Sequence, residues 1–122
     1  MNSWSYRRRS GVGCDAEIVR DLPDEQWRAL LGADRWRLAE QISIETRESP
    51  ATSRTRAWAA FECLKKAGLP LDSPLQLVSA TDDGWVMLSA GSATVATYVA
   101  MVREAHAPLA FAVLAGDSRA SV

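Results

Sequence analysis

Apolar and polar residues alternate along residues 10–19, the first patterned stretch of the chain. Small or apolar side chains occupy every second position: Val12, Cys14, Ala16 and Ile18. A period of two is typical of a β-strand with one buried face, and we assign these four side chains to that face. Asp15 and Glu17 then share the opposite face, so their carboxylates point in the same direction.

A helical pattern extends from Asp24 to about residue 47 and is interrupted once. Pro23 and the acidic pair that follows it are typical of a first helical turn. Apolar residues then recur at helical spacing up to Gly32, which we expect to end a first helix. A second helix follows directly, and Pro50 closes the unit.

The clearest helical pattern comes next, with Thr52 or Ser53 as its cap and Gly68 as its stop. Spacings of three and four place five residues on one side: Ala57, Trp58, Phe61, Leu64 and Lys65. Glu62 and Lys66 lie four positions apart on another side. Such a pair is common on exposed helix surfaces, and this interpretation stays open beside a functional one.

The second half of the chain has the pattern of β-structure. Strands are expected over residues 75–81, 85–90, 94–102 and 109–114. Asp82-Asp83-Gly84 predicts a hairpin turn, because Asp-Gly tolerates positive φ. This order of elements predicts an α+β fold, with helices packed on one face of an antiparallel sheet. We assign the domain to residues 10–116, between a flexible tip at 1–9 and a frayed tail at 117–122.

Length and composition fit one globular domain of 122 residues, 48% of them hydrophobic. The net charge is −1, which argues against nucleic-acid binding, because phosphate backbones attract basic surfaces. No apolar run is long enough for a membrane-spanning helix. Cys14 and Cys63 lack the number and spacing of a disulfide framework or a metal cluster. These features predict a cytoplasmic protein.

Three carboxylates are candidates for a metal site. Asp15 and Glu17, on one strand face, can converge on a hard cation such as Mg²⁺. Glu62, on a neighbouring helix, is the best candidate for a third ligand, which leaves positions for water and phosphate oxygens. The alternative is a solvated strand face, because a D-x-E pattern alone has little specificity.

Two segments together resemble a known family. Gly13-Cys14-Asp15-Ala16-Glu17 resembles the G-x-D-x-E motif of 4′-phosphopantetheinyl transferases. The segment from Trp58 to Lys66, WAAFECLKK, resembles their W-[STC]-x-K-E-[AS]-x-x-K motif. The interval between the motifs and the β-rich second half are also similar. The resemblance covers residues 11–115 and is greatest to the transferase domains built into the C-termini of enediyne-type polyketide synthases.

The resemblance implies Mg²⁺-dependent transfer of 4′-phosphopantetheine from coenzyme A to a serine of an acyl carrier protein, as a step of polyketide biosynthesis. Asp15, Glu17 and Glu62 would hold the metal, and Glu62 would ligate it or take the proton from the carrier serine. Lys66 would reach the phosphates of coenzyme A as a fixed charge or protonate the leaving group. Lys65 is a second candidate for binding coenzyme A.

The family also sets expectations about assembly. D-x-E spacing is typical of transferases with two lobes, whose chains are about twice this long. Single lobes of this length resemble holo-acyl-carrier-protein synthases, which form trimers with active sites between subunits. We therefore expect a homotrimer, or a second lobe elsewhere in a larger parent chain.

Two positions depart from the family's pattern. Ala59 stands where the motif has a small hydroxyl residue or a cysteine. Phe61 stands where the motif has a lysine, which removes one charge directed at the phosphates, and Lys65 is a candidate substitute.

Six arginines are candidates for contact with an acidic carrier protein, with a solvated face as the alternative: Arg7, Arg8, Arg9, Arg20, Arg54 and Arg56. Two other functions stay open, a non-catalytic interaction or oligomerisation module of a polyketide synthase and a different Mg²⁺-dependent phosphate-handling enzyme.

Overall fold

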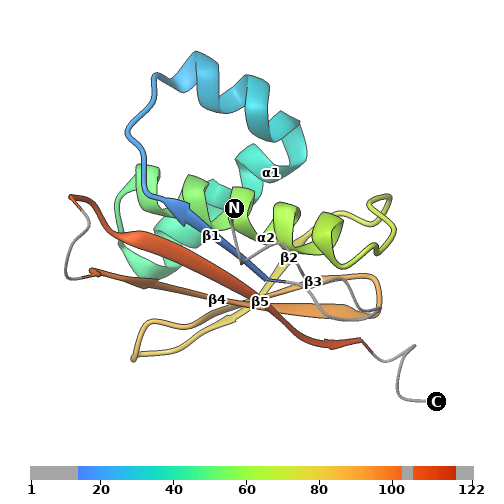
Figure 1. Cartoon of the computed structure of the whole chain (residues 1–122). Coiled ribbons are helices and arrows are strands. Elements are labelled where there is room, and N and C mark those ends of the chain that lie inside the picture. The colour runs from blue at the N-terminus through green and yellow to red at the C-terminus, as the bar shows by residue number, and fades with distance from the viewer. Residues whose placement is uncertain (1–13, 103–105, 118–122) are drawn as a thin grey trace.

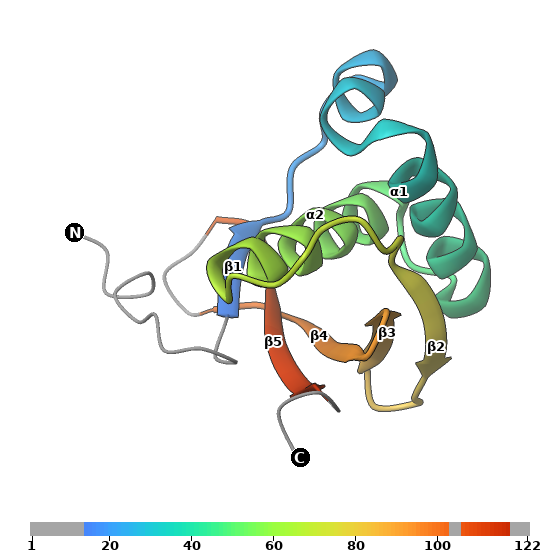
Figure 2. The ribbon, with the colours of Figure 1, turned by 90° about the vertical axis from the view of Figure 1, so that its right-hand side faces the viewer.

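The computed structural model describes residues 14–102 and 106–117. It contains two helices and five strands: β1 (Cys14–Ile18), α1 (Asp24–Thr46), α2 (Pro50–Lys66), β2 (Gln76–Ala80), β3 (Val86–Ala90), β4 (Ala93–Ala100) and β5 (Leu109–Asp117). The strands form one antiparallel sheet in the order β1-β5-β4-β3-β2. Both helices pack on the same face of that sheet (Figures 1 and 2). The predicted α+β class is therefore confirmed.

The first and last strands of the fold are neighbours. Asp15 is paired with Ala112 of β5, and Glu17 with Ala110. Both alanines are fully buried beneath α2, so the two carboxylates lie on the helix-covered face of the sheet. The predicted orientation of this strand was wrong. Cys14, Ala16 and Ile18 lie on the other face, because a cation on α2 compensates the buried charge of Asp15.

A break at Gly32 divides α1 into two parts. The backbone there is non-helical, with φ 77° and ψ 171°, a conformation that glycine adopts without strain. Trp27 and Leu31 before the break and Leu38 and Ile42 after it are buried in one core. The sequence correctly predicted an interruption at this residue.

Ser49 caps α2, rather than the predicted Thr52 or Ser53. Its hydroxyl oxygen accepts a hydrogen bond from the Thr52 backbone N–H at 3.2 Å, and Pro50 occupies the first helical turn. Ser53 is buried instead and donates to Glu48. The helix ends at the predicted place, where Gly68 adopts φ 74°.

Small residues on α2 bring this helix close to the sheet. Ala57, Ala59, Ala60 and Cys63 are all fully buried. The main apolar side chains that face them from the sheet are Val86, Leu88, Val95, Ala110 and Ala112. The close approach matters for function, because it fixes α2 above β1 and β5.

Arg56 of α2 is buried within an ionic network and is only 4% exposed. Its guanidinium donates to both carboxylate oxygens of Glu48 and to the backbone oxygens of Thr97 and Gly84. These contacts join α2 to β4 and to the β2–β3 turn. The expectation that Arg56 contacts a carrier protein was therefore wrong, because its donors are used inside the fold.

The predicted hairpin at residues 82–84 is present between β2 and β3. Gly84 has φ 101°, and a Cβ at this position would lie 3.1 Å from Cε1 of Tyr98. Glycine therefore satisfies both the turn and the close contact. β5 continues beyond its predicted end to Asp117, which is paired with Ala93.

The sheet face opposite the helices is apolar. Ile18 of β1 and Val113 of β5 are 47% and 46% exposed there, and Trp85 packs on Tyr98 with ring centres 5.0 Å apart. No described element covers this face, since both helices lie on the other side (Figure 2). The predicted tip at 1–9, with Arg7, Arg8 and Arg9, and residues 118–122 lie outside the described residues.

Within the described residues, neither helix combines the length and the apolar character that crossing a lipid bilayer requires.

Candidate functional site

The two motif segments meet where β1 passes alongside α2. Nζ of Lys66 lies 2.6 Å from Oδ1 of Asp15, in an ion pair between the two elements. The Asp15 side chain is 3% exposed and that of Lys66 is 30% exposed, so the pair opens to solvent on the lysine side. Oδ2 of Asp15 is buried and has no hydrogen-bond partner among the described residues.

Glu17 lies two residues along β1, on the same face as Asp15. Burial, followed by hydrogen bonding to Asp15 and the charges of Asp15 and Glu62, raises the pKa of Glu17 to about 8 against the opposing charge of Lys66. Three carboxylates are therefore close enough to repel one another. This crowding favours either a proton on Glu17 or a bound cation.

Glu17 also lines a pocket of about 90 Å³ between β1 and the helices. Trp27 and Trp58 contribute apolar surface to this pocket. Their presence accounts for the loss of water around Glu17, which is the main cause of its raised pKa.

Glu62 lies on α2 at the edge of this group. Its Oε2 is 3.4 Å from Nζ of Lys65, in a partly exposed pair within one helical turn. Such pairs are weak, so Glu62 can leave Lys65 at little cost. Its charge acts on both Glu17 and Lys66, which places all four groups in one electrostatic cluster.

The carboxylates of Asp15 and Glu17 fit a magnesium ion whose other ligands would be water and phosphate oxygens. Across residues 14–102 and 106–117, no group of three or more His, Cys, Asp or Glu side chains is arranged to hold a metal. Mg²⁺ commonly takes only one or two protein carboxylates and fills its other positions with water and phosphate oxygens. The buried, unpartnered Oδ2 of Asp15 and the crowded Glu17 supply that pair.

Lys66 is held in its charged form. Burial alone would lower its pKa, but hydrogen bonding to Asp15 and the charges of Asp15, Glu17 and Glu62 outweigh burial and raise the pKa above its ordinary value. The ammonium is therefore a fixed positive charge at neutral pH. This favours electrostatic stabilisation over proton donation as its chemical role.

The contact between Phe61 and Arg35 is one that sequence reasoning missed. Phe61 packs on Trp58, with ring centres 5.8 Å apart, and lies against the core as expected. Cζ of Arg35, from α1, lies 3.8 Å from the centre of the Phe61 ring. No spacing pattern signals this contact, because the two residues come from different helices.

The cysteines have no catalytic environment. Cys63 is fully buried, and burial raises the pKa of its thiol to about 12, so it stays protonated. This agrees with a structural role for Cys63. Cys14 is half-buried on the outer face of β1, and its expected place in the core was wrong.

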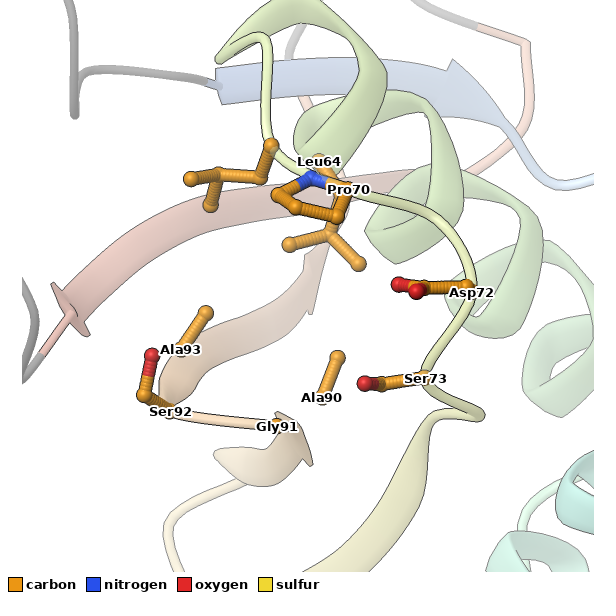
Figure 3. A pocket seen from close by; sticks show the side chains of 9 residues that line it. Leu64, Pro70, Asp72, Ser73, Ala90, Gly91, Ser92 and Ala93 are labelled. Atoms are coloured by element: carbon orange, nitrogen blue, oxygen red, sulfur yellow. The ribbon is translucent and has the colours of Figure 1, made fainter.

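A pocket of about 230 Å³ lies between the segment after α2 and the β3–β4 turn (Figure 3). Its lining includes Leu64, Pro70, Asp72, Ser73 and Gly91. None of the predicted site residues lines it, and Asp72 is its one ionisable side chain. The predicted site residues therefore lie on β1 and α2 and not in the lining of this pocket.

Comparisons of the chain with models of protein families, with curated proteins and with solved structures find no match. What the site can do therefore has to be inferred from its own residues.

Proposed function

We propose that this domain transfers 4′-phosphopantetheine from coenzyme A to a serine hydroxyl of an acyl carrier protein. The observation that carries the proposal is the meeting of Asp15 and Lys66, which brings the two motif segments together with Glu17 and Glu62 beside them. A cluster of carboxylates and a fixed cation suits the handling of a phosphate ester with a divalent metal.

Asp15 and Glu17 would hold Mg²⁺, and Glu62, whose charge acts on Glu17, would serve as a base. When bound, the ion would neutralise charge on the pyrophosphate of coenzyme A. Asp15 is suited to this because its Oδ2 is buried and unpartnered. Occupation of the site would also offset the repulsion by Asp15 and Glu62, which adds to burial in raising the pKa of Glu17.

The proposed reaction forms one bond and breaks one bond. The carrier serine oxygen attacks the phosphorus attached to the pantetheine arm, and the bond from that phosphorus to the bridging oxygen breaks. The serine proton passes to Glu62, and adenosine 3′,5′-bisphosphate leaves. Glu62 is suited to the role of base because only a weak, partly exposed pair with Lys65 holds it.

Lys66 would stabilise the negative charge that develops on the phosphate oxygens. Its raised pKa keeps it protonated throughout, so it would act by charge rather than by giving up a proton. Its partner Asp15 fixes its position at 2.6 Å. Lys65 would add a second, more mobile charge from the next position of the helix.

An interaction module is a second candidate, and the apolar face of the sheet that no described element covers favours it. The exposed Ile18 and Val113 on this face are suited to contact with another protein surface. The same face suits the homotrimer, or the second lobe of a larger parent chain, that a complete transferase cleft would need. Sedimentation analysis of the isolated chain measures its assembly directly.

Binding and transfer assays separate these functions. A transferase or another phosphate-handling enzyme binds coenzyme A more tightly with Mg²⁺ than with EDTA, whereas an interaction module shows no difference. Modification of a carrier serine then separates the transferase from other phosphate chemistry. Asp15→Asn should abolish the effect of Mg²⁺ on binding, and the exposed Asp72→Asn is the matched control. An unchanged response in Asp15→Asn would remove this residue from the metal site.

A further inference from the structure

A basic and aromatic cluster joins the two helices beside Glu62. It contains Arg35 of α1 and Phe61 and Lys65 of α2. Cζ of Arg35 lies 3.8 Å from the centre of the Phe61 ring, and Nζ of Lys65 lies 5.6 Å from the same centre. Both distances are within the range of cation–π attraction. One ring therefore holds two cations that belong to different helices.

Among the described residues, Arg35 has no anionic partner in an ion pair. Its Nε is buried without a hydrogen-bond partner among residues 14–102 and 106–117. The adjacent Asp34 is paired with Arg37 at 2.8 Å. Half-buried guanidinium groups are normally paired with a carboxylate or a phosphate. The unused donors of Arg35 therefore favour an external anion.

The backbone holds Arg35 in place for this contact. Gly32 breaks α1 three residues earlier with φ 77°, and a Cβ at Gly32 would lie 3.9 Å from Nη2 of Arg35. Phe61 is fixed in turn by its packing on Trp58. The guanidinium is thus ordered before any ligand binds, which lowers the entropy cost of binding.

Lys65 connects this cluster with the candidate site. Its Nζ lies 3.4 Å from Oε2 of Glu62, whose charge in turn acts on Glu17. Two cations and one carboxylate leave a net positive charge around the Phe61 ring. A ligand whose negative charge binds the cations around the Phe61 ring, and which also extends to the Asp15–Glu17 pair, would contact both groups of residues.

We infer that Arg35 and Lys65 form a phosphate-binding site beside the Phe61 ring. The guanidinium fork matches two phosphate oxygens, and the lysine supplies a point charge. Lys65 is linked through Glu62 to a carboxylate cluster that is suited to a divalent cation, which favours a phosphate ligand over a simple carboxylate. The identity of the ligand as coenzyme A rests on the proposed function, whereas phosphate binding itself does not.

Calorimetric titration of the full chain with inorganic pyrophosphate, in Mg²⁺ and without carrier protein, tests the site. Arg35→Gln should weaken binding about tenfold or more, because a charged hydrogen-bonding group is lost. Arg37→Gln, two residues along the same helix, should change binding less than about twofold, because Arg37 is exposed and paired with Asp34. Equal binding by wild type and Arg35→Gln, or an equal loss in both variants, would overturn the inference.

A conservative variant keeps the test independent of folding. Arg35→Lys retains the positive charge but loses the fork, so it should bind pyrophosphate more tightly than Arg35→Gln and more weakly than wild type. Circular dichroism melts identify any variant that has lost its fold. Two folded variants with equal affinity would contradict a role for the charge of Arg35.

Coenzyme A and dephospho-coenzyme A, which lacks the 3′-phosphate, distinguish the source of the phosphate. If Arg35→Gln weakens both ligands equally, the site takes the pyrophosphate. If it weakens coenzyme A alone, the site takes the 3′-phosphate. Either result supports the site, and wild-type affinity of Arg35→Gln for both ligands overturns it.

Failure of the site and failure of the transferase proposal give different results. Binding of pyrophosphate that depends on Arg35, without modification of any carrier, would support the phosphate site and contradict the transferase. Carrier modification with a KM for coenzyme A that Arg35→Gln leaves unchanged would support the transferase and overturn the phosphate site.

Discussion

Lys66 and Asp15 lie 51 positions apart in the chain, and their charged atoms are 2.6 Å apart in the fold. This ion pair joins the C-terminal turn of α2 to the first strand. It also explains how a carboxylate that is 3% exposed is tolerated beneath a helix. Structure and proposed chemistry therefore depend on the same contact.

Removal of Lys66 should destabilise the fold. Lys66→Met leaves the buried Asp15 charge without a partner, so we expect a loss of about 2 kcal/mol in the free energy of unfolding. This loss is smaller than that for a fully buried ion pair, because solvent reaches the lysine side. Urea denaturation measures it. Lys65→Met, in an exposed pair, should cost less than about 0.5 kcal/mol.

A double-mutant cycle isolates the coupling between the two groups. Asp15→Asn combined with Lys66→Met should be more stable than the sum of the single effects predicts, because no unpaired charge remains. Additive effects would mean that the two charges do not stabilise each other.

Arg56 should be essential for stability rather than for activity. Arg56→Met removes the cation that pairs with Glu48 and the donor to the backbone oxygens of Thr97 and Gly84, so we expect a loss of about 3–5 kcal/mol. Arg37→Met, in an exposed ion pair, should change stability by less than about 0.5 kcal/mol. Chemical denaturation of both variants checks the difference, and similar losses would contradict a structural role for the Arg56 network.

Glu17 should make the metal-free protein sensitive to pH. Its pKa is raised from 4.5 to about 8 in the fold, so the unfolded chain loses this proton first. The contribution of protonated Glu17 to the stability of the fold is fully present below about pH 4.5 and is lost as the pH rises through about 8. In EDTA, Glu17→Gln should therefore gain stability relative to wild type as the pH rises. Asp15, Glu62 and Lys66 face Glu17 and are unchanged in both proteins.

Thermal melts of wild type and Glu17→Gln across this pH range measure the effect. A difference in melting temperature that is the same at about pH 5 and about pH 9 would show that Glu17 is not held protonated by its surroundings.

Phe61 should contribute to coenzyme A binding through its ring. Phe61→Leu keeps an apolar side chain but removes cation–π attraction worth about 0.5–1 kcal/mol, so the KM for coenzyme A should rise a few-fold with kcat little changed. Phe61→Tyr keeps the ring and should behave like wild type. Equal KM values for the two variants would mean that the ring does not hold the cations.

Local sequence signals predicted much of the fold. The Asp82-Asp83-Gly84 turn and the break at Gly32 follow from backbone preferences that depend on few neighbours. Alternation and helical spacing located every strand and helix to within a few residues. The cap of α2 was misplaced because Ser49, Thr52 and Ser53 all have hydroxyl groups that can cap a helix.

Features that depend on contacts between distant parts of the chain could not be predicted from the sequence. Alternation in β1 located the strand but not its buried face, because that face depends on Lys66 of a distant helix. Arg56 was a candidate for contact with a carrier protein, with a solvated face as the alternative, whereas it is buried and bound to Glu48 and Thr97. Arg35 was not singled out at all, since its contact with Phe61 arises only when α1 packs on α2.

Intact mass spectrometry of an apo acyl carrier protein, incubated with this chain, coenzyme A and Mg²⁺, tests the central claim most directly. The account predicts that the carrier gains the mass of one phosphopantetheine. EDTA and Glu62→Gln should abolish the gain, while Glu40→Gln, on the exposed surface of α1, should preserve it. An unmodified carrier, with a folded chain that has assembled into its native oligomer, would contradict the transferase account.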